Sequence, residues 1–333
     1  MAKTTFATND SLTKKMWEEK LYRDVVKESY FMSKFAGENK DSLVQVNRQL
    51  EKSQGDNVTF GIRMRLTGSG VTAGEVLEGK EEKLTTYNFN VSLQQYRHGV
   101  RDNGAMDRKR PMFSIDSESE QAIKDWSSEK IDQLLFDQIN VVTYTKKFYG
   151  GDATSTATLE TADKLTPALI SKIRSWAITG GARTYVPLRP VRVEGKNLFV
   201  LLVSPDVAYD LKQDSTFTQA MREALPRAVD HPLFTDALGM WDGVVIHEHE
   251  NVLNYTTGGS GGNVPYSLCH FMGAQSLVWA WGSRPKVTQK MFDYDNEHGF
   301  SIDWLSASGK PYFNSLGYGS VALYVARTNI AGA

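Results

Sequence analysis

The stretch His247–Glu250 places two imidazoles and two carboxylates within four residues. On a β-strand, His247 and His249 point to the same face, which suits a pair of zinc ligands. No third ligand is evident, and the i, i+4 histidine spacing of helical zinc proteases is absent. The pattern is therefore more typical of polar residues at a strand end than of a metal site. Cys269 and His270 are adjacent and point apart on a regular element, so they do not predict a catalytic dyad.

Residues Gly258–Gly262 read Gly-Gly-Ser-Gly-Gly, so Ser260 matches the string of a nucleophile elbow. Such an elbow needs a strand before the serine and a helix after it. Here Thr-Thr precedes the glycines and Asn-Val-Pro follows them, which indicates a flexible loop over residues 255–263. Two later histidines, His270 and His298, keep an α/β hydrolase that uses Ser260 as an alternative.

The stretch Gly74–Lys80 fits the first seven positions of a phosphate-binding loop. The eighth position, which should hold magnesium through Ser or Thr, is Glu81. Neighbouring carboxylates would also repel a polyphosphate. We therefore predict no nucleotide, and no other cofactor or metal, at this or any other site.

Two charged segments of opposite sign lie close together in the sequence. Residues 71–83 carry a net charge of −2 and residues 97–110 a net charge of +3. The rest of the chain has no basic bias, so we expect the second segment to face an acidic neighbour rather than DNA. The candidate contact residues are Glu75, Glu78, Lys80, Glu81 and Glu82 in the acidic segment, and Arg97, Arg101, Arg108, Lys109 and Arg110 in the basic one.

Composition limits the class of protein. The 333 residues are 41% apolar and 23% charged, with 38 Lys+Arg against 39 Asp+Glu, which excludes a disordered chain and argues against a dedicated nucleic-acid binder. A near-zero balance also leaves no electrostatic barrier to self-association. A single cysteine, the lack of an apolar leader and the glycine-interrupted uncharged stretch 251–283 favour a soluble protein made inside the cell, with no membrane segment.

The clearest structural pattern is a pair of alternating apolar strands. Residues 58–66 and 87–93 each alternate apolar and polar side chains, and a charged, glycine-punctuated segment joins them. This predicts a long hairpin whose apolar face lies on another surface, because a lone hairpin is marginal in water. Residues 9–36 predict an amphipathic helix, ended by Gly37, with a stripe that its own core or a neighbouring subunit must cover.

Helices and strands alternate through the rest of the chain. Residues 116–139 predict the longest helix, with Ser117 and Glu120 at capping-box spacing. Further helices are expected at 166–181, 206–212 and 216–224, and strands at 141–149, 198–203, 244–249, 287–292, 299–305 and 321–326. The apolar run 268–281 is expected to be a buried core element. The fold class is α+β.

This order of elements resembles that of the major capsid proteins of tailed bacteriophages, which have the Hong Kong 97-type fold. Several strings narrow the resemblance to the major-capsid family of N-four-like podophages, over residues 10–326. These strings are Gly55-Asp56, Val71–Glu82, Gln95–Val100, Pro187–Val191, Ser204–Lys212, His231–Phe234 and Gly243–Val252.

The resemblance implies a division of the chain. Residues 1–54 would be an N-terminal arm, 55–98 the extended E-loop hairpin, and 99–189 a peripheral (P) domain with the spine helix 116–139. Residues 190–284 would form the axial (A) domain, 285–315 would return to the P domain as strands, and 316–333 would add a C-terminal strand to the A domain.

The resemblance also implies a function. The chain would self-assemble as hexamers and pentamers into an icosahedral head that encloses phage DNA, with no enzymatic activity. Its partners would be itself, a portal, a scaffolding protein, a decoration protein and DNA on the inner face. It would be assembled in the host bacterial cytoplasm and reside in the virion. Besides the hydrolase, a capsid-associated decoration protein is the other alternative.

Overall fold

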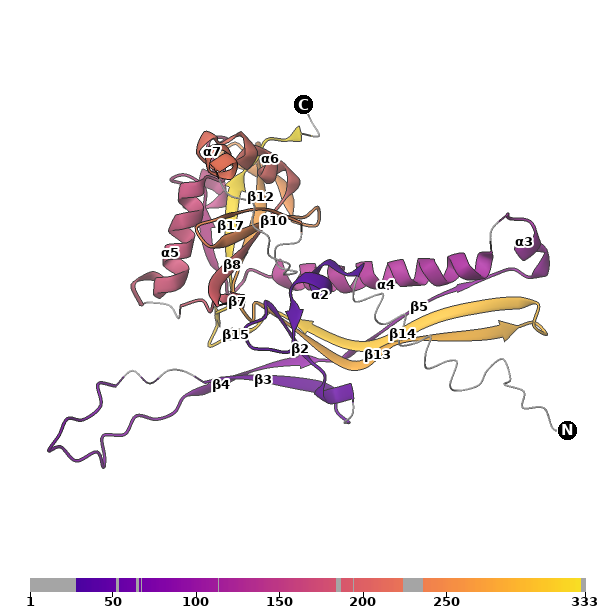
Figure 1. Cartoon of the computed structure of the whole chain (residues 1–333), viewed down its shortest axis with the longest axis horizontal. Helices are drawn as coiled ribbons and strands as arrows, with labels where there is room; N and C mark the ends of the chain where they lie inside the picture. Colours follow the sequence, from indigo (N-terminus) through magenta and orange to yellow (C-terminus); the bar gives the residue numbers. More distant parts are fainter. Residues whose placement is uncertain are drawn as a thin grey trace.

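The computed structural model describes residues 28–51, 54–63, 66, 68–112, 114–183, 187–193, 195–223 and 236–330. One compact lobe sits above an elongated base, and the base extends to both sides (Figure 1). The predicted α+β class is confirmed, with one five-stranded sheet in the base and one eight-stranded sheet in the lobe.

The base is built on two long antiparallel strands, β13 (Leu277–Phe292) and β14 (Glu297–Gly309). At about 3.3 Å per residue, β13 spans roughly 50 Å. The sheet order is β1-β2-β13-β14-β5, where the remaining strands are β1 (Ala36–Gly37), β2 (Val44–Asn47) and β5 (Gln94–Arg101). Alternate residues of β14, including Ile302 and Trp304, are buried on one face.

Helix α4 (Ile115–Ile139) covers that face and confirms the predicted long helix. The Trp126 ring lies 5.5 Å from that of Trp304, and Ile123, Ile131 and Leu135 are fully buried. The predicted capping box is wrong, because the cap is Ser114, whose hydroxyl accepts from the Ser117 amide. Within the described ranges no helix, α4 included, is long and apolar enough to cross a membrane.

The predicted hairpin is confirmed as β3 (Asn57–Arg63) and β4 (Thr86–Ser92). Its base lies on the other face of the sheet, where Val58 and Val91 pack against Val278 and Ala307. A Cβ at Gly309 would stand 2.5 Å from Val91, so glycine permits this close approach. The base of the hairpin is thus covered within the subunit, whereas the described residues 68–85 are almost all exposed.

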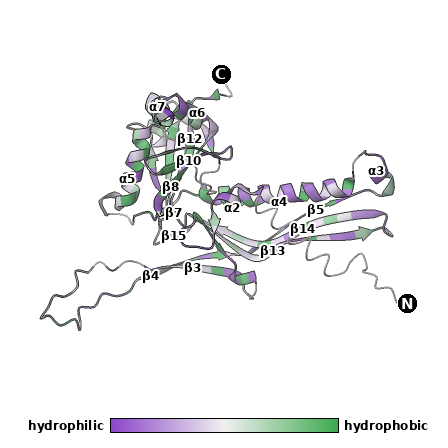
Figure 2. Ribbon diagram, in the orientation of Figure 1, coloured by the Kyte–Doolittle hydropathy of each residue, from purple (hydrophilic) through white to green (hydrophobic). Residues whose placement is uncertain are grey.

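The lobe contains the second sheet, ordered β6-β17-β12-β8-β10-β9, with β11 on β12 and β7 on β8. Its central strands are hydrophobic in Figure 2. Three helices, α5 (Pro167–Arg183), α6 (Pro205–Gln213) and α7 (Ser215–Glu223), supply apolar side chains to the same core as these strands. The strands are β6 (Lys146–Tyr149), β7 (Val191–Val193), β8 (Lys196–Val203), β9 (Ala237–Trp241), β10 (Val244–Glu248), β11 (Asn254–Gly258), β12 (Val264–Met272) and β17 (Ser320–Ala326).

Two sequence predictions are corrected here. The expected loop 255–263 is in part the strand β11, because Asn254 and Tyr255 pair with β12. The expected strand 141–149 begins only at Lys146. A small hairpin of β15 (Tyr312–Phe313) and β16 (Leu316–Gly317) connects the two sheets.

The domain limits expected from the resemblance stay a prediction, and two of them fall inside continuous elements of structure. β5 crosses the limit between residues 98 and 99, and β13 crosses the limit between residues 284 and 285. β6 falls within the expected range 99–189, yet it pairs with β17 in the eight-stranded sheet.

The N-terminal segment is fastened to α4 by one carboxylate. Asp132 accepts hydrogen bonds from the Ser29 hydroxyl at 2.8 Å and from the amides of Tyr30 and Phe31 at 2.7 and 3.0 Å. Ser29 caps the short helix α2 (Tyr30–Lys34) with extended backbone, so the predicted helix 9–36 is not continuous. Residues 9–27 of that prediction lie outside the described residues. Burial raises the pKa of Asp132, and the donated hydrogen bonds act against this rise.

The carboxyl end of α4 is held by buried polar groups. The Lys310 ammonium donates to the carbonyls of Ile139 and Val141, both at 2.9 Å, which satisfies acceptors that a helix end leaves open. His270 Nε2 lies 2.9 Å from the Asn140 side-chain oxygen. Burial lowers the pKa of Lys310 to about 7. Burial, and then the Lys310 charge, lower the pKa of His270 to about 3.

We expect Asp132→Ala to release the arm while the rest of the subunit stays folded. Three donors lose their acceptor, which costs about 1–3 kcal/mol of unfolding free energy for partly buried groups. Urea unfolding measures the loss, and hydrogen exchange of the Tyr30 and Phe31 amides localises it. Asp125→Ala, on the exposed side of α4, is the matched control. Unchanged exchange at Tyr30 in the Asp132 variant would contradict this anchoring role.

We expect His270 to destabilise the fold in acid. The unfolded imidazole binds a proton near its ordinary pKa of 6.5 and the folded one only near 3, so unfolding free energy falls as pH drops through that window. The slope is at most about 1.4 kcal/mol per pH unit. His270→Gln keeps an amide donor for Asn140 and should flatten the profile between pH 6.5 and 4, measured by urea unfolding. His98→Gln is the control. Equal slopes in the His270 variant and the parent would refute the assignment.

Candidate contact surfaces

The hairpin tip is the most exposed apolar and acidic segment of the base. Val76, Leu77 and Leu84 are 69%, 55% and 54% exposed, and the described residues 68–85 form no strand or helix. Isolated exposed apolar residues are ordinary, but three on one projecting loop favour a contact with another surface.

The candidate residues of the tip differ in their local roles. Glu81 and Glu82 accept backbone hydrogen bonds from Gly79 and Gly68 at 2.7 and 2.6 Å, and so shape the loop. Lys80 pairs with Glu75 at 3.0 Å. Glu78 makes no hydrogen bond or ion pair with the described residues, so it is the carboxylate most available to a partner.

Four of the five basic residues lie at the opposite end of the base, whereas Arg97 lies beside Asp303 in the middle of β14. Arg97 and Arg101 are on β5, Arg108 and Lys109 on α3 (Ala105–Lys109), and Arg110 ends that helix. Arg101 pairs with Glu297, Arg108 with Asp102 and Arg110 with Asp107. Within the described chain, Arg97 and Lys109 have no ion-pair partner, so the available positive charge is smaller than the sequence indicates.

The structure does not bring the acidic and basic segments together within one subunit. The tip projects from the left of the base in Figure 1, whereas α3 lies at its right end. Contact between them therefore requires two copies of the chain.

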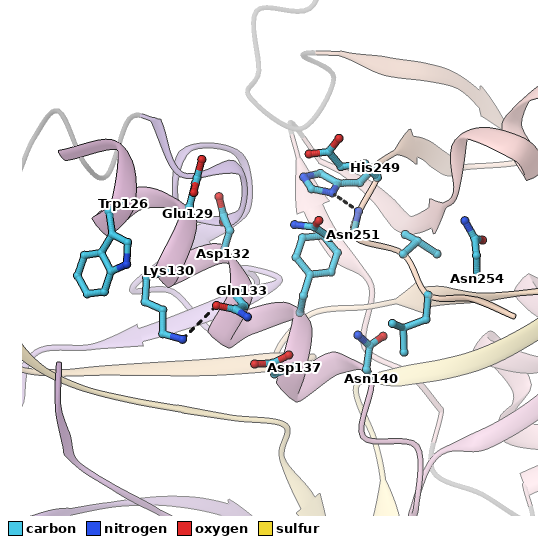
Figure 3. Close-up of a pocket in the computed structure, with 14 residues that line it drawn as sticks. Trp126, Glu129, Lys130, Asp132, Gln133, Asp137, Asn140, His249, Asn251 and Asn254 are labelled. Carbon is cyan, nitrogen blue, oxygen red and sulfur yellow. Dashed lines mark hydrogen bonds between the residues drawn. The ribbon is translucent and has the colours of Figure 1, made fainter. Parts of the chain in front are cut away.

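A cleft of about 860 Å³ separates α4 from the loop after β10. Figure 3 shows Glu129, Gln133 and Asp137 along α4, with His249 and Asn251 facing them from the lobe. The lining carries the carboxylates of Glu129, Asp132, Asp137 and Glu250 against the single cation Lys130. The cleft is acidic because its carboxylates outnumber this lysine, which donates a hydrogen bond to the Gln133 side-chain oxygen at 3.0 Å.

The two histidines of the sequence motif are used in packing at the lobe side of this region. His247 is buried with its ring 5.0 Å from that of Phe35. The His249 ring lies 4.4 Å from Tyr30 and 4.6 Å from Phe136, and its Nδ1 accepts from the Asn251 amide at 3.1 Å. Burial lowers the pKa of His249. These rings join the arm to the lobe. That neither histidine binds a metal stays a prediction.

The other motifs are not arranged for catalysis among the described residues. Ser260 is exposed in the turn between β11 and β12, and a strand rather than a helix follows it, so the elbow interpretation is not supported. Cys269 is buried in β12, and burial raises the pKa of its thiol to about 12. The thiol is therefore protonated at neutral pH and a weak nucleophile.

Sequence reasoning missed one carboxylate–imidazole cluster at the far end of the base. Atoms of Asp102, Asp116 and His298 lie within 4.8 Å of one another. Both Asp102 oxygens are already in use, one by Arg108 at 2.5 Å and one by the His298 amide at 2.6 Å. The cluster therefore fastens β5 and α3 to β14. The acidic cleft was also missed, because its two walls are over 100 residues apart in sequence.

The sequence matches one family model, described as phage capsid protein, over residues 5–147 and 140–322. The major capsid protein of Pseudomonas phage KPP25 is 26% identical over 368 aligned positions, which cover 97% of each chain. The match therefore extends over nearly the whole protein.

Solved structures give the same result. The capsid of Ralstonia phage GP4 superposes with a TM-score of 0.82 at 26% identity, over 99% of both chains. The Cyanophage Pam1 capsid asymmetric unit has a TM-score of 0.78 at 21% identity, over 91% of this chain and 93% of that one. These neighbours confirm the expected Hong Kong 97-type fold. With its sequence matched from residue 5 to 322 and its base, hairpin and lobe matched in space, the chain belongs to the phage capsid protein family.

Proposed function

We propose that this chain is the major capsid protein of a tailed phage, and that many copies assemble as hexamers and pentamers into an icosahedral head. Full-length similarity to a phage major capsid protein is the observation that carries the proposal. The exposed hairpin tip supports it, because its apolar side chains have no cover in the subunit. The protein acts as a structural component and not as an enzyme.

The proposed division of labour follows the two sheets. The base, with α4 as spine helix, is the P domain, and the lobe is the A domain. The segment before β1 is the arm and the β3–β4 hairpin is the E-loop. The portal, a scaffolding protein, a decoration protein and packaged DNA are the expected partners, and assembly takes place in the host cytoplasm. The narrower kinship with N-four-like podophages remains a prediction.

In the proposed assembly, each contact joins two different surfaces of neighbouring copies. Such heterologous contacts close into rings when the rotation between copies permits. The tip of one copy then meets the basic end of the next, with Glu78 facing Arg97 or Lys109. Each exposed ion pair contributes less than about 1 kcal/mol to the free energy of association. The contact therefore stabilises the shell only because it is repeated many times.

Overproduction of the chain, with and without a phage scaffold, tests the proposed function. We expect shells or capsomers by negative-stain microscopy and light scattering. Ser260→Ala should assemble like the parent and a phosphonate probe should leave Ser260 unlabelled, because the serine has no chemical role. A strictly monomeric protein at high concentration with scaffold present, or stoichiometric labelling of Ser260, would count against a shell protein.

We expect Glu78→Lys to leave the subunit folded and to reduce assembly, most strongly at low salt where screening is weakest. The triple reversal of Glu78, Glu81 and Glu82 should reduce it further, although two of these residues also shape the loop. Circular dichroism checks folding, and sedimentation at several salt concentrations measures shell yield.

Arg97→Glu together with Lys109→Glu should restore part of the yield lost in the Glu78 variant. Glu160→Lys, a reversal at an exposed position on the lobe, is the control. A normal shell yield at every salt concentration for the triple variant of Glu78, Glu81 and Glu82 would contradict this contact and would show that the tip is only a solvated loop.

A further inference from the structure

The acidic cleft between α4 and the loop after β10 has more negative charge than the subunit neutralises. Among the described residues, Glu129, Asp137 and Glu250 make no ion pair, and all three are exposed. Trp126 and the exposed Leu253 add apolar surface to the lining. A concave surface that joins carboxylates to apolar side chains fits a cationic, amphipathic chain segment.

The cleft has a regular spacing along one wall. Glu129, Gln133 and Asp137 are four residues apart and therefore share one face of α4. At 1.5 Å per residue the outer two carboxylates are about 12 Å apart along the helix axis. Figure 3 shows these side chains along the α4 wall and the loop residues on the other side.

A segment of matching charge and length lies in this chain, outside the described residues. Residues 14–27 contain five cations and three carboxylates, and the sequence predicts a helix there. Lys20, Arg23 and Lys27 follow i, i+3, i+7 spacing and would span about 10 Å on one face of that helix. Trp17 and Leu21 would border this row and offer apolar surface to the cleft.

We propose that the acidic cleft receives residues 14–27 of a second copy of the chain, with the Lys20, Arg23 and Lys27 row on the carboxylates of α4. The inference rests on the proposed assembly function and deepens it. It assigns the arm a receiving surface on the spine helix and lobe of a neighbour.

The path of the described chain argues for a second copy rather than the same one. Glu28 pairs with Lys124 at 2.7 Å, and the Phe31 ring packs edge-to-face against Phe136 with ring centres 4.9 Å apart. The described chain therefore runs along α4 from Lys124 toward its carboxyl end, and Glu28 lies beside Lys124, before the first α4 residue that lines the cleft. A segment of the same chain that precedes Glu28 could enter the cleft only by turning back along this path.

Cysteine pairs test the proposal in assembled particles. Gln133→Cys is combined in turn with Lys20→Cys, Arg23→Cys and Lys27→Cys, and the sole native cysteine is buried, so background oxidation is low. A disulfide needs Cα atoms within about 7 Å. We expect at least one pair to give covalent multimers on a non-reducing gel. Gln121→Cys, exposed on α4 outside the cleft, should give none with the same partners.

The outcomes separate this inference from the function on which it rests. Particles in which none of the three pairs forms a multimer, or in which the disulfide is within one chain, overturn the arm contact alone. Failure of the unsubstituted chain to form any particle, with scaffold supplied, overturns the proposed function and the arm contact with it.

Charge reversal gives a second, independent readout. Glu129→Lys with Asp137→Lys should lower particle yield at least tenfold at low salt, whereas Glu118→Lys, at the other end of α4, should not. Adding Lys20→Glu, Arg23→Glu and Lys27→Glu should restore at least half of the yield. A loss that the arm reversal does not rescue would assign the cleft to a different cationic partner, such as a scaffold, and overturn the proposal.

Discussion

The packing of α4 across β14 is the contact on which the rest of this subunit depends. Trp126 and Trp304 meet at its centre, and Ile131 and Leu135 are fully buried beside them. Each such side chain contributes about 1.5–3 kcal/mol when removed from water. The arm, the lobe and the hairpin are each attached to this one layered unit, and the arm also packs on the lobe through His247 and His249.

Each attachment uses a different kind of interaction. Asp132 holds the arm by hydrogen bonds to the start of α2. Lys310 and Asn140 tie the end of α4 to strands of both sheets, through buried polar groups that tolerate no loss of a partner. The hairpin base rests on the far face of the sheet through small apolar side chains. The central layer thus carries a lobe with a hydrophobic core of its own, and a hairpin and an arm that are covered mainly where they meet this layer or the lobe.

The charges are distributed unevenly over the subunit. α4 bears seven carboxylates and two lysines, and much of this helix has the colour of hydrophilic residues in Figure 2. The basic end of the base is largely neutralised by Asp102, Asp107 and Glu297. Charged surfaces of this kind favour specificity in the association of copies rather than tight binding by any single ion pair. The reason is that exposed charges steer association more than they stabilise the complex.

The sequence by itself determined the elements whose pattern is local. Alternation identified the β3–β4 hairpin, helical periodicity identified α4, and the apolar run 198–203 identified β8. The order of these helices and strands along the chain was then sufficient to predict the fold class, because it resembles the order found in the capsid family. Charge sums over 71–83 and 97–110 were also readable, since they need only composition.

Only the tertiary structure decided which of those charges are free and which apolar faces are covered. Arg101 pairs with Glu297, and Val58 is covered by residues of β13 and β14; these partners are almost 200 residues away or more in the sequence. The Asp132 anchor and the acidic cleft are products of the same long-range pairing. The pattern of residues within one segment predicts whether that segment is a helix or a strand. Which distant residue a side chain contacts depends on where the sheets place the other segments, and therefore on the packing of the whole chain.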